Sequence, residues 1–135
     1  MARRRDRVVV AAVRVLAVDD QQVFLQAARE LIAAAQDFEQ VGEASSGAEA
    51  VRLAAELRPD LVLIDVRMPG MDGVETMRRI MAEVPETLVV LTSLDEATDL
   101  PSALLDAAAP VHVRKQDLSV RRLRELWDSR PRTRA

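Results

Sequence analysis

The sequence contains no cysteine and no tyrosine, and it has one histidine and one lysine among 135 residues. The absence of cysteine excludes a disulfide framework and thiolate metal sites, and a single histidine is too few for a histidine-rich zinc site. Aromatic residues make up only 2%, so Val, Leu, Ile and Ala must build the core. These absences indicate an aliphatic globular domain, for which we expect a reducing, cytoplasmic setting.

Long apolar runs are also missing. The basic start and apolar stretch of residues 1–18 superficially suggest a signal peptide, but Arg14 interrupts the stretch and Asp19 and Asp20 close it. No segment approaches the roughly 20 apolar residues of a membrane span. We therefore expect neither a leader nor contact with a membrane, and the length fits one domain.

Charge is distributed unevenly around a net value of −3. Residues 1–7 carry +3 and residues 121–135 carry +4, which leaves −10 for residues 8–120. We expect a basic N-terminal extension over residues 1–12 and a basic C-terminal tail over residues 129–135. Basic ends can attract nucleic acid, but no aromatic residues interleave with the arginines as they do in single-strand binders, so direct nucleic-acid binding is not expected.

Apolar runs of strand length alternate with stretches of helical spacing. The runs lie at residues 13–18, 40–44, 61–64, 88–91 and 111–113. The helical stretches have apolar faces formed by Phe24, Ala28, Leu31 and Ala35; Ala50, Val51, Ala54, Ala55 and Leu57; Val74, Met77, Ile80 and Met81; Leu100, Leu104 and Leu105; and Leu118, Leu123, Leu126 and Trp127. Ser46 and Glu49 form a capping box before the second stretch. This (βα)5 pattern predicts an α/β fold with a doubly wound parallel five-stranded sheet, whose strands after the first are near-continuous apolar runs.

Polar side chains stand at the ends of four predicted strands. Asp19 and Asp20 follow the first, Asp65 the third, Thr92 the fourth and Lys115 the fifth. Ligands of open α/β sheets bind at this edge, so we expect these side chains to meet there. Three carboxylates need a compensating cation, and all-oxygen ligands favour a hard one such as Mg²⁺. With a threonine hydroxyl and a lysine ammonium group for phosphate oxygens, the set predicts a phosphoryl site.

Lysine is informative because the chain uses it once against 18 arginines. A compact ammonium group suits a single salt contact in a tight pocket better than a guanidinium fork does. The competing explanation is that one leftover lysine in an arginine-rich chain falls at this position by chance.

The most specific string is Asp-Val-Arg-Met-Pro-Gly-Met-Asp-Gly at residues 65–73, in which Pro69 and Gly70 predict a turn and Asp72 opens a helix. Here the sequence resembles the receiver domain of bacterial two-component response regulators, in the CheY-like superfamily. The resemblance covers about residues 14–127. It rests on the Asp19–Asp20 pair, the LVLIDVRMPGMDG run, Thr92 followed by a small residue, Lys115, and their spacing.

The resemblance implies a flavodoxin-like receiver domain over residues 13–128 with strand order 2-1-3-4-5. Asp65 would be the phosphoacceptor, taking its phosphoryl group from a phosphohistidine of a sensor histidine kinase. Asp20 and Asp65 would bind Mg²⁺ (or Mn²⁺) directly, Asp19 through water, and Arg67 through its backbone carbonyl. Thr92 and Lys115 would bind the phosphoryl oxygens. Such a domain phosphorylates itself and dephosphorylates slowly at most, so it is not expected to be a turnover enzyme.

Two positions depart from the family pattern. His112 occupies the switch position, where Tyr or Phe is usual; it either swings inward when Thr92 is drawn to the phosphoryl group or stays as a static histidine on an edge strand. Residues 107–110 read Ala-Ala-Ala-Pro in place of a glycine-containing exit from the fourth helix, so we expect that exit to be displaced or loosely ordered.

Partners follow from the same resemblance. We expect a sensor histidine kinase and a homodimer through the face of the fourth helix, fifth strand and fifth helix. A DNA-binding output domain is expected only if the chain is a fragment of a longer regulator, and Gln116 after Lys115 is typical of the subgroup that often carries one.

Two other function classes remain open from the residues. A Mg²⁺-dependent phosphatase with an aspartyl nucleophile needs a second acid two residues after the nucleophile, where this chain has Arg67. The other alternative is a protein-interaction module that acts without phosphorylation. A nucleotide-binding site is not expected, because the chain has only four glycines and no phosphate-cradling glycine loop.

Overall fold

The computed structural model describes residues 11–94 and 111–131. Its five strands are all parallel, in the order β2-β1-β3-β4-β5, which confirms the predicted doubly wound sheet. The strands are β1 (Val13–Val18), β2 (Phe38–Ala44), β3 (Leu61–Asp65), β4 (Leu88–Ser93) and β5 (Val111–Arg114). The predicted fourth helix around Leu104 and the exit at residues 107–110 lie outside the described residues.

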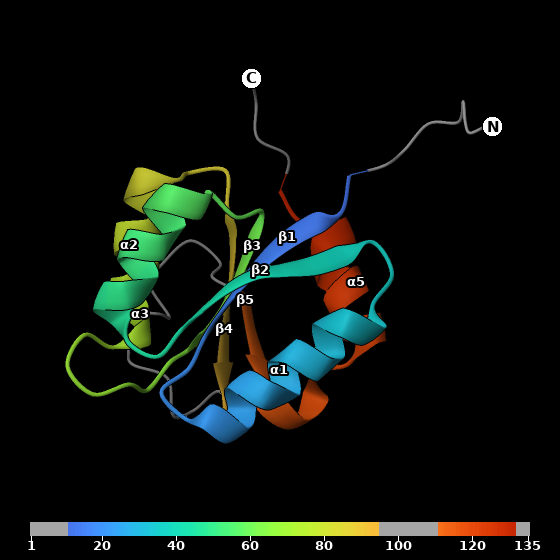
Figure 1. The fold of residues 1–135 in the computed structure, drawn as a ribbon, viewed down its shortest axis with the longest axis horizontal. Helices are drawn as coiled ribbons and strands as arrows, with labels where there is room; N and C mark the ends of the chain where they lie inside the picture. The colour runs from blue at the N-terminus through green and yellow to red at the C-terminus, as the bar shows by residue number, and fades with distance from the viewer. Residues whose placement is uncertain (1–10, 95–110, 132–135) are drawn as a thin grey trace.

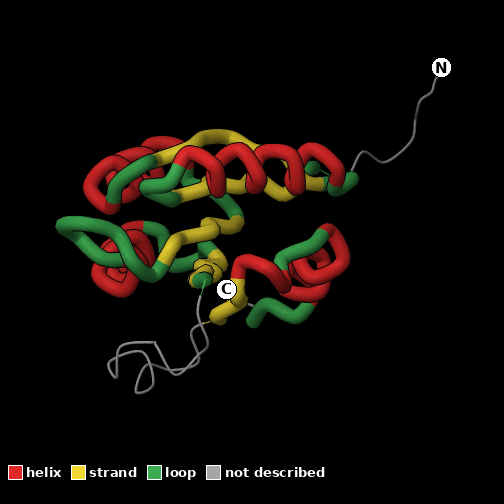
Figure 2. The backbone as a smooth tube through the Cα atoms, turned by 90° about the horizontal axis from the view of Figure 1, so that it is seen from below, coloured by secondary structure: helices red, strands yellow, loops and turns green. Residues whose placement is uncertain are grey.

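Helices cover both faces of the sheet (Figures 1 and 2). One face carries α2 (Gly47–Leu57) and α3 (Gly73–Glu83), and the other carries α1 (Gln22–Ala34) and α5 (Val120–Asp128). A short 3-10 helix, η2 (Lys115–Asp117), leads from β5 towards α5. No helix in the described part of the chain is long and apolar enough to cross a membrane.

Side chains of the buried strands point alternately to the two faces of the sheet, so the core consists of two clusters, one on each face. In β3, Val62 and Ile64 pack with α2 and α3, whereas Leu61 and Leu63 pack with α1 and α5. Successive side chains of a strand point to opposite faces, so a strand buried on both faces is apolar throughout. The fully buried β3 and β4 meet this expectation, and they bring Asp65 and Thr92 to the end of the core.

Two helices, α2 and α3, start at the predicted capping residues. The side chain of Ser46 accepts a hydrogen bond from the Glu49 amide at 3.2 Å, and that of Asp72 accepts one from the Glu75 amide at 2.9 Å. Each satisfies an amide that the first turn leaves without a partner. The Glu49 carboxylate in turn accepts a hydrogen bond from the Ser45 amide, one residue before the cap.

Three details differ from the sequence prediction. β2 starts at Phe38 and is only half-buried along most of its length, because it is an edge strand with a neighbour on one side only. The buried side of α1 is wider than predicted: Leu25 and Ile32 are buried as well as the predicted Ala35, and the predicted Phe24, Ala28 and Leu31 are half-buried. Met81 of α3 is exposed, so the apolar face of that helix is narrower than its sequence suggests.

Candidate functional site

The sheet brings the predicted polar residues to one edge. β1 ends at Val18, which is level with Ile64 of β3, and the next residues along these strands are Asp19 and Asp65. Asp65 is in turn level with Thr92 of β4. Parallel pairing in this register places the carboxyl ends of the strands together, as the sequence predicted.

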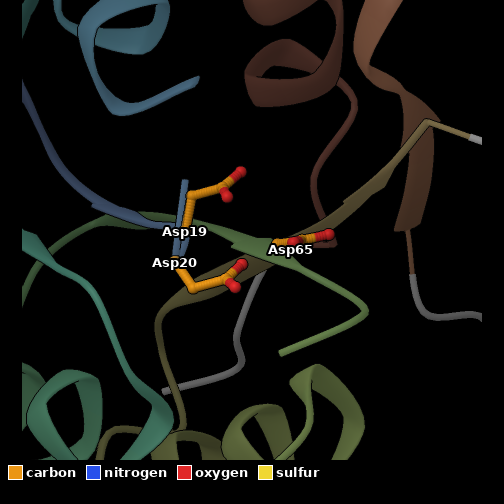
Figure 3. Close-up of side chains that lie close together, drawn as sticks. All are labelled: Asp19, Asp20 and Asp65. Carbon is orange, nitrogen blue, oxygen red and sulfur yellow. The ribbon is translucent and has the colours of Figure 1, made fainter. Parts of the chain in front are cut away.

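Three carboxylates gather at this edge (Figure 3). Asp19, Asp20 and Asp65 each offer one oxygen atom, and these three atoms lie within 4.8 Å of one another. Asp19 and Asp65 are buried, at 5% and 7% exposure, and Asp20 is half-buried. Negative charges this close repel strongly, and a cluster of carboxylate oxygens has the donor chemistry that a hard divalent cation requires.

Lys115 supplies the positive charge in the cluster. Its Nζ lies 2.6 Å from Oδ2 of Asp19 and 3.7 Å from Oδ2 of Asp65, and its side chain is only 11% exposed. The Nζ also stands 3.7 Å from the centroid of the Phe24 ring. The only lysine of the chain is therefore held among two carboxylates and an aromatic ring.

Asp65 has an unusual proton affinity. Its pKa is raised to about 6, chiefly by burial; the nearby charge of Lys115 works against this rise, and the charges of Asp19 and Asp20 add to it. The Arg67 amide, which donates to Oδ1 of Asp65 at 3.3 Å, also lowers the pKa. At neutral pH the carboxylate is mostly ionised and yet poorly solvated, which is the state that favours nucleophilic attack.

The loop after Asp65 is shaped by two glycines. Gly70 has a φ of 78°, a left-handed conformation that suits glycine in a turn. A Cβ atom on Gly73 would clash with the carbonyl oxygen of Asp65 and lie 2.7 Å from the Cα of Val66. Gly73 therefore lets the start of α3 lie directly against the backbone that carries Asp65.

Thr92 and His112 lie on neighbouring strands. Thr92 is buried, and its hydroxyl group forms no hydrogen bond with any residue of the described ranges, so it is available to an incoming group. His112 of β5 is half-buried, and its Nε2 lies 2.8 Å from the hydroxyl oxygen of Ser93, the residue after Thr92. Burial lowers the pKa of His112, which favours its neutral form.

Sequence reasoning missed two partners of these residues. Phe24 was assigned to an apolar helix face, whereas its ring contacts Lys115. Its position in the first turn of the helix that follows the Asp19–Asp20 pair was the available signal. The contact between Ser93 and His112 depends on side-chain direction across two strands and had no signal in the sequence.

Known proteins resemble the chain in sequence. The model of the response regulator receiver domain family matches residues 15–126. The response regulator GacA of Pseudomonas viridiflava is 37% identical over 103 residues, which cover 76% of this chain and 48% of GacA. The protein-glutamate methylesterase/protein-glutamine glutaminase 4 of Myxococcus xanthus is 46% identical over 83 residues, which cover 62% of this chain and 24% of that protein. The chain thus spans about half, or less, of the length of these relatives.

Solved structures agree with the sequence relatives. The signal receiver domain of the response regulator NarL from Mycobacterium tuberculosis superposes with a TM-score of 0.78 at 28% sequence identity, covering 90% of this chain and 100% of that one. The residues matched by the family model include residues of the helices on both faces of the sheet. They also include the strand ends that carry the acidic cluster, Thr92 and Lys115. The chain belongs to the family of response regulator receiver domains.

Proposed function

We propose that Asp65 accepts a phosphoryl group from a phosphohistidine of a sensor histidine kinase, in a reaction that needs Mg²⁺ or Mn²⁺, and that the modified domain relays the signal by changing conformation. The observation that carries the proposal is the placement of a buried, ionisable Asp65 beside two further carboxylates and the ammonium group of Lys115. Membership of the receiver family supports the same role.

The chemistry needs little from the protein beyond position and charge. An oxygen atom of the Asp65 carboxylate attacks the phosphorus atom, the bond from phosphorus to the histidine nitrogen breaks, and an acyl phosphate forms. Charge spread over the three equatorial phosphoryl oxygens has to be neutralised during this transfer. Lys115 supplies a positive charge and Thr92 a hydroxyl donor, both at the strand ends next to Asp65.

The acidic cluster fits a divalent cation, because its close donor atoms are all carboxylate oxygens. Asp20 and Asp65 would bind the cation directly, Asp19 through water, and Arg67 through its backbone carbonyl. When bound, the cation neutralises charge on the phosphoryl oxygens.

Repeated turnover is not part of the proposal. Aspartyl-nucleophile phosphatases need an acid two residues after the nucleophile, and this chain has the exposed Arg67 there. We therefore propose a phosphoacceptor that modifies itself and loses phosphate slowly at most.

His112 is proposed as the residue that reports phosphorylation to the β4–β5 region. Its contact with Ser93 ties it to the strand that carries Thr92, so a shift of Thr92 towards a phosphoryl group would pull on it. If His112→Ala and wild type showed the same change in amide hydrogen exchange on phosphorylation, the switch role would be ruled out.

The output and partners remain proposals. A homodimer would use the face that includes β5 and α5, while the fourth helix of that face lies outside the described residues. We include a DNA-binding output domain in the proposal only if the chain is part of a longer protein. The chain covers half or less of the length of its relatives, which is compatible with such a longer protein. The setting we propose is the cytoplasm.

The test is phosphorylation by acetyl phosphate, a small activated donor, read by intact mass. Wild type with Mg²⁺ is expected to gain one phosphate that hydroxylamine removes, as it does from acyl phosphates. Asp65→Asn should gain none, whereas the matched change Asp128→Asn, at an exposed position in α5, should behave as wild type.

Three outcomes would contradict the proposal. No gain at saturating donor would favour an interaction module that acts without phosphorylation. Unchanged labelling in the presence of a chelator would remove the cation from the reaction. Phosphate release over many turnovers would point to a phosphatase.

A further inference from the structure

We propose that Phe24 is a positioning residue for Lys115, whose ring holds the ammonium group where it can serve a phosphoryl group on Asp65. This inference rests on the proposed function of Asp65 and adds a residue to its machinery. Phe24 does not touch the reacting atoms in this role; it acts through the lysine.

The contact is close and shielded from water. The Nζ of Lys115 lies 3.7 Å from the centroid of the Phe24 ring, well inside the roughly 6 Å over which a cation is attracted to an aromatic face. The lysine side chain is 11% exposed, so solvent weakens the attraction less than it would at the surface. Asp19, Asp65 and Phe24 together surround the ammonium group.

Packing alone does not account for Phe24. The side chains that α1 buries in the core are Leu25 and Ile32, and Phe24 belongs to neither of the two hydrophobic clusters. Its ring instead lines a cavity of about 120 Å³ that Lys115 and Leu118 also line. The ring therefore contacts the ammonium group of Lys115 and borders a cavity.

An aromatic ring has an advantage over another acid at this place. The ammonium group has three N–H donors, and the approach of a phosphoryl group requires some of them to be free for its oxygens. A third carboxylate would accept a hydrogen bond from one of these N–H groups and cancel the positive charge. An aromatic ring attracts the ammonium group and leaves the charge and the N–H donors of that group for oxygen ligands. The ring thus keeps Lys115 near Asp65, at a distance of 3.7 Å, without competing with the phosphoryl group.

The single lysine makes the contact directly measurable. In a sample labelled with ¹³C-lysine, only Lys115 contributes an ε-methylene signal. Ring currents should shift its protons upfield in wild type, and Phe24→Leu should return them to the ordinary position. The shift tests whether the ring lies against the lysine in solution, and the kinetic series below tests whether the charge of its face matters.

The kinetic test varies the ring without varying its shape. Fluorinated phenylalanines placed at position 24 weaken the negative face of the ring step by step, so the rate of Asp65 phosphorylation by acetyl phosphate with Mg²⁺ should fall with each fluorine. Phe24→Leu should lower the rate roughly 3- to 10-fold. The same amino acids at Phe38, whose ring lies 5.5 Å from the Arg124 guanidinium away from this site, are the matched control and should leave the rate unchanged.

The outcomes separate this inference from the proposed function. If wild type takes up phosphate and the rate stays flat across the fluorinated series, or if the wild-type ε-methylene signal is unshifted, the positioning role is overturned and the role of Asp65 stands. If wild type takes up no phosphate, the proposed function fails and the positioning role falls with it. A graded fall in rate with an upfield-shifted lysine signal supports both.

Discussion

On one face of the sheet α2 and α3 pack so closely that no room is left for a Cβ atom at their first residues, whereas on the other face α1 leaves open space. A Cβ atom on Gly73 would clash with the backbone of Asp65, and one on Gly47 with the hydroxyl group of Thr76. Across the sheet, a cavity of about 120 Å³ lies between α1 and the strands, beside Lys115.

This difference separates two needs of the proposed reaction. Attack in line with the leaving group requires the nucleophile to be held in place, and the closely packed face holds the backbone of Asp65. Lys115, which contacts Asp19 at 2.6 Å, has to direct an N–H group to a phosphoryl oxygen as well, and it stands on the side that has space. Changes on the first face should therefore cost stability, while changes on the second should be tolerated.

The largest effect is expected for Gly73→Ala. The new methyl group meets backbone atoms of Asp65 and Val66, which cannot rotate away, so the free energy of unfolding should fall by about 3 kcal/mol. Gly70→Ala, three residues earlier, has open space around the new methyl group and only a positive φ to adopt, so it should cost about 1 kcal/mol. Urea unfolding of both variants measures the difference, and equal losses would show that the approach of α3 is not tight.

The second prediction concerns the charge of Asp65. The pKa of Asp65 is about 6 in the folded protein, above its ordinary value of 3.8. Protonated Asp65 therefore stabilises the folded state in full below pH 3.8, and this stabilisation is lost as the pH rises through 6. Asp65→Asn cannot ionise and should unfold with a free energy about 2 kcal/mol higher than wild type at pH 7 in metal-free buffer. At pH 4.5 the difference in unfolding free energy between Asp65→Asn and wild type should be less than half of its value at pH 7.

Urea titrations at the two pH values provide the measurement, and a variant less stable than wild type at pH 7 would contradict the raised pKa. Magnesium ions sharpen the comparison, because a ligand that binds the folded state stabilises it. We expect them to stabilise wild type more than Asp65→Asn.

The third prediction addresses the contact between Ser93 and His112. Removing the hydroxyl group in Ser93→Ala should lower the free energy of unfolding by about 1 kcal/mol at pH 8, where the imidazole is neutral in both states. Burial lowers the folded pKa of His112 below 6.5, so the stability linked to this histidine is complete above pH 6.5 and is lost as the pH falls. A double-mutant cycle with His112→Phe isolates the pair, and a coupling energy near zero would show that the contact adds no stability.

Sequence patterns predicted the parts of this molecule that depend on periodicity and on strand ends. Four of the five strands start where the apolar runs do, and the rule for carboxyl ends brought Asp65 and Thr92 together. The burial of Leu25 and Ile32 in α1 was not predicted, because it is decided by packing against the sheet and the helical periodicity also fits the neighbouring face. The contact between Phe24 and Lys115 had one signal in the sequence, the place of Phe24 shortly after the Asp19–Asp20 pair, whereas the cavity beside it had none.

The smallest effect is expected from filling that cavity. Ala28 lies one turn after Phe24 in α1 and lines the open space, so Ala28→Leu should bury additional apolar surface and raise the free energy of unfolding by about 0.5–1 kcal/mol. Ala54→Leu makes the same change in α2, where the side chain has no exposed surface, and should lower it by about 1–3 kcal/mol. Ala33→Leu, at an exposed position of α1, controls for helix propensity and should change little. Opposite signs for the first two substitutions, measured by thermal and urea unfolding, would establish that the two faces differ in packing; a loss of stability in both would mean that α1 closes on its cavity in solution.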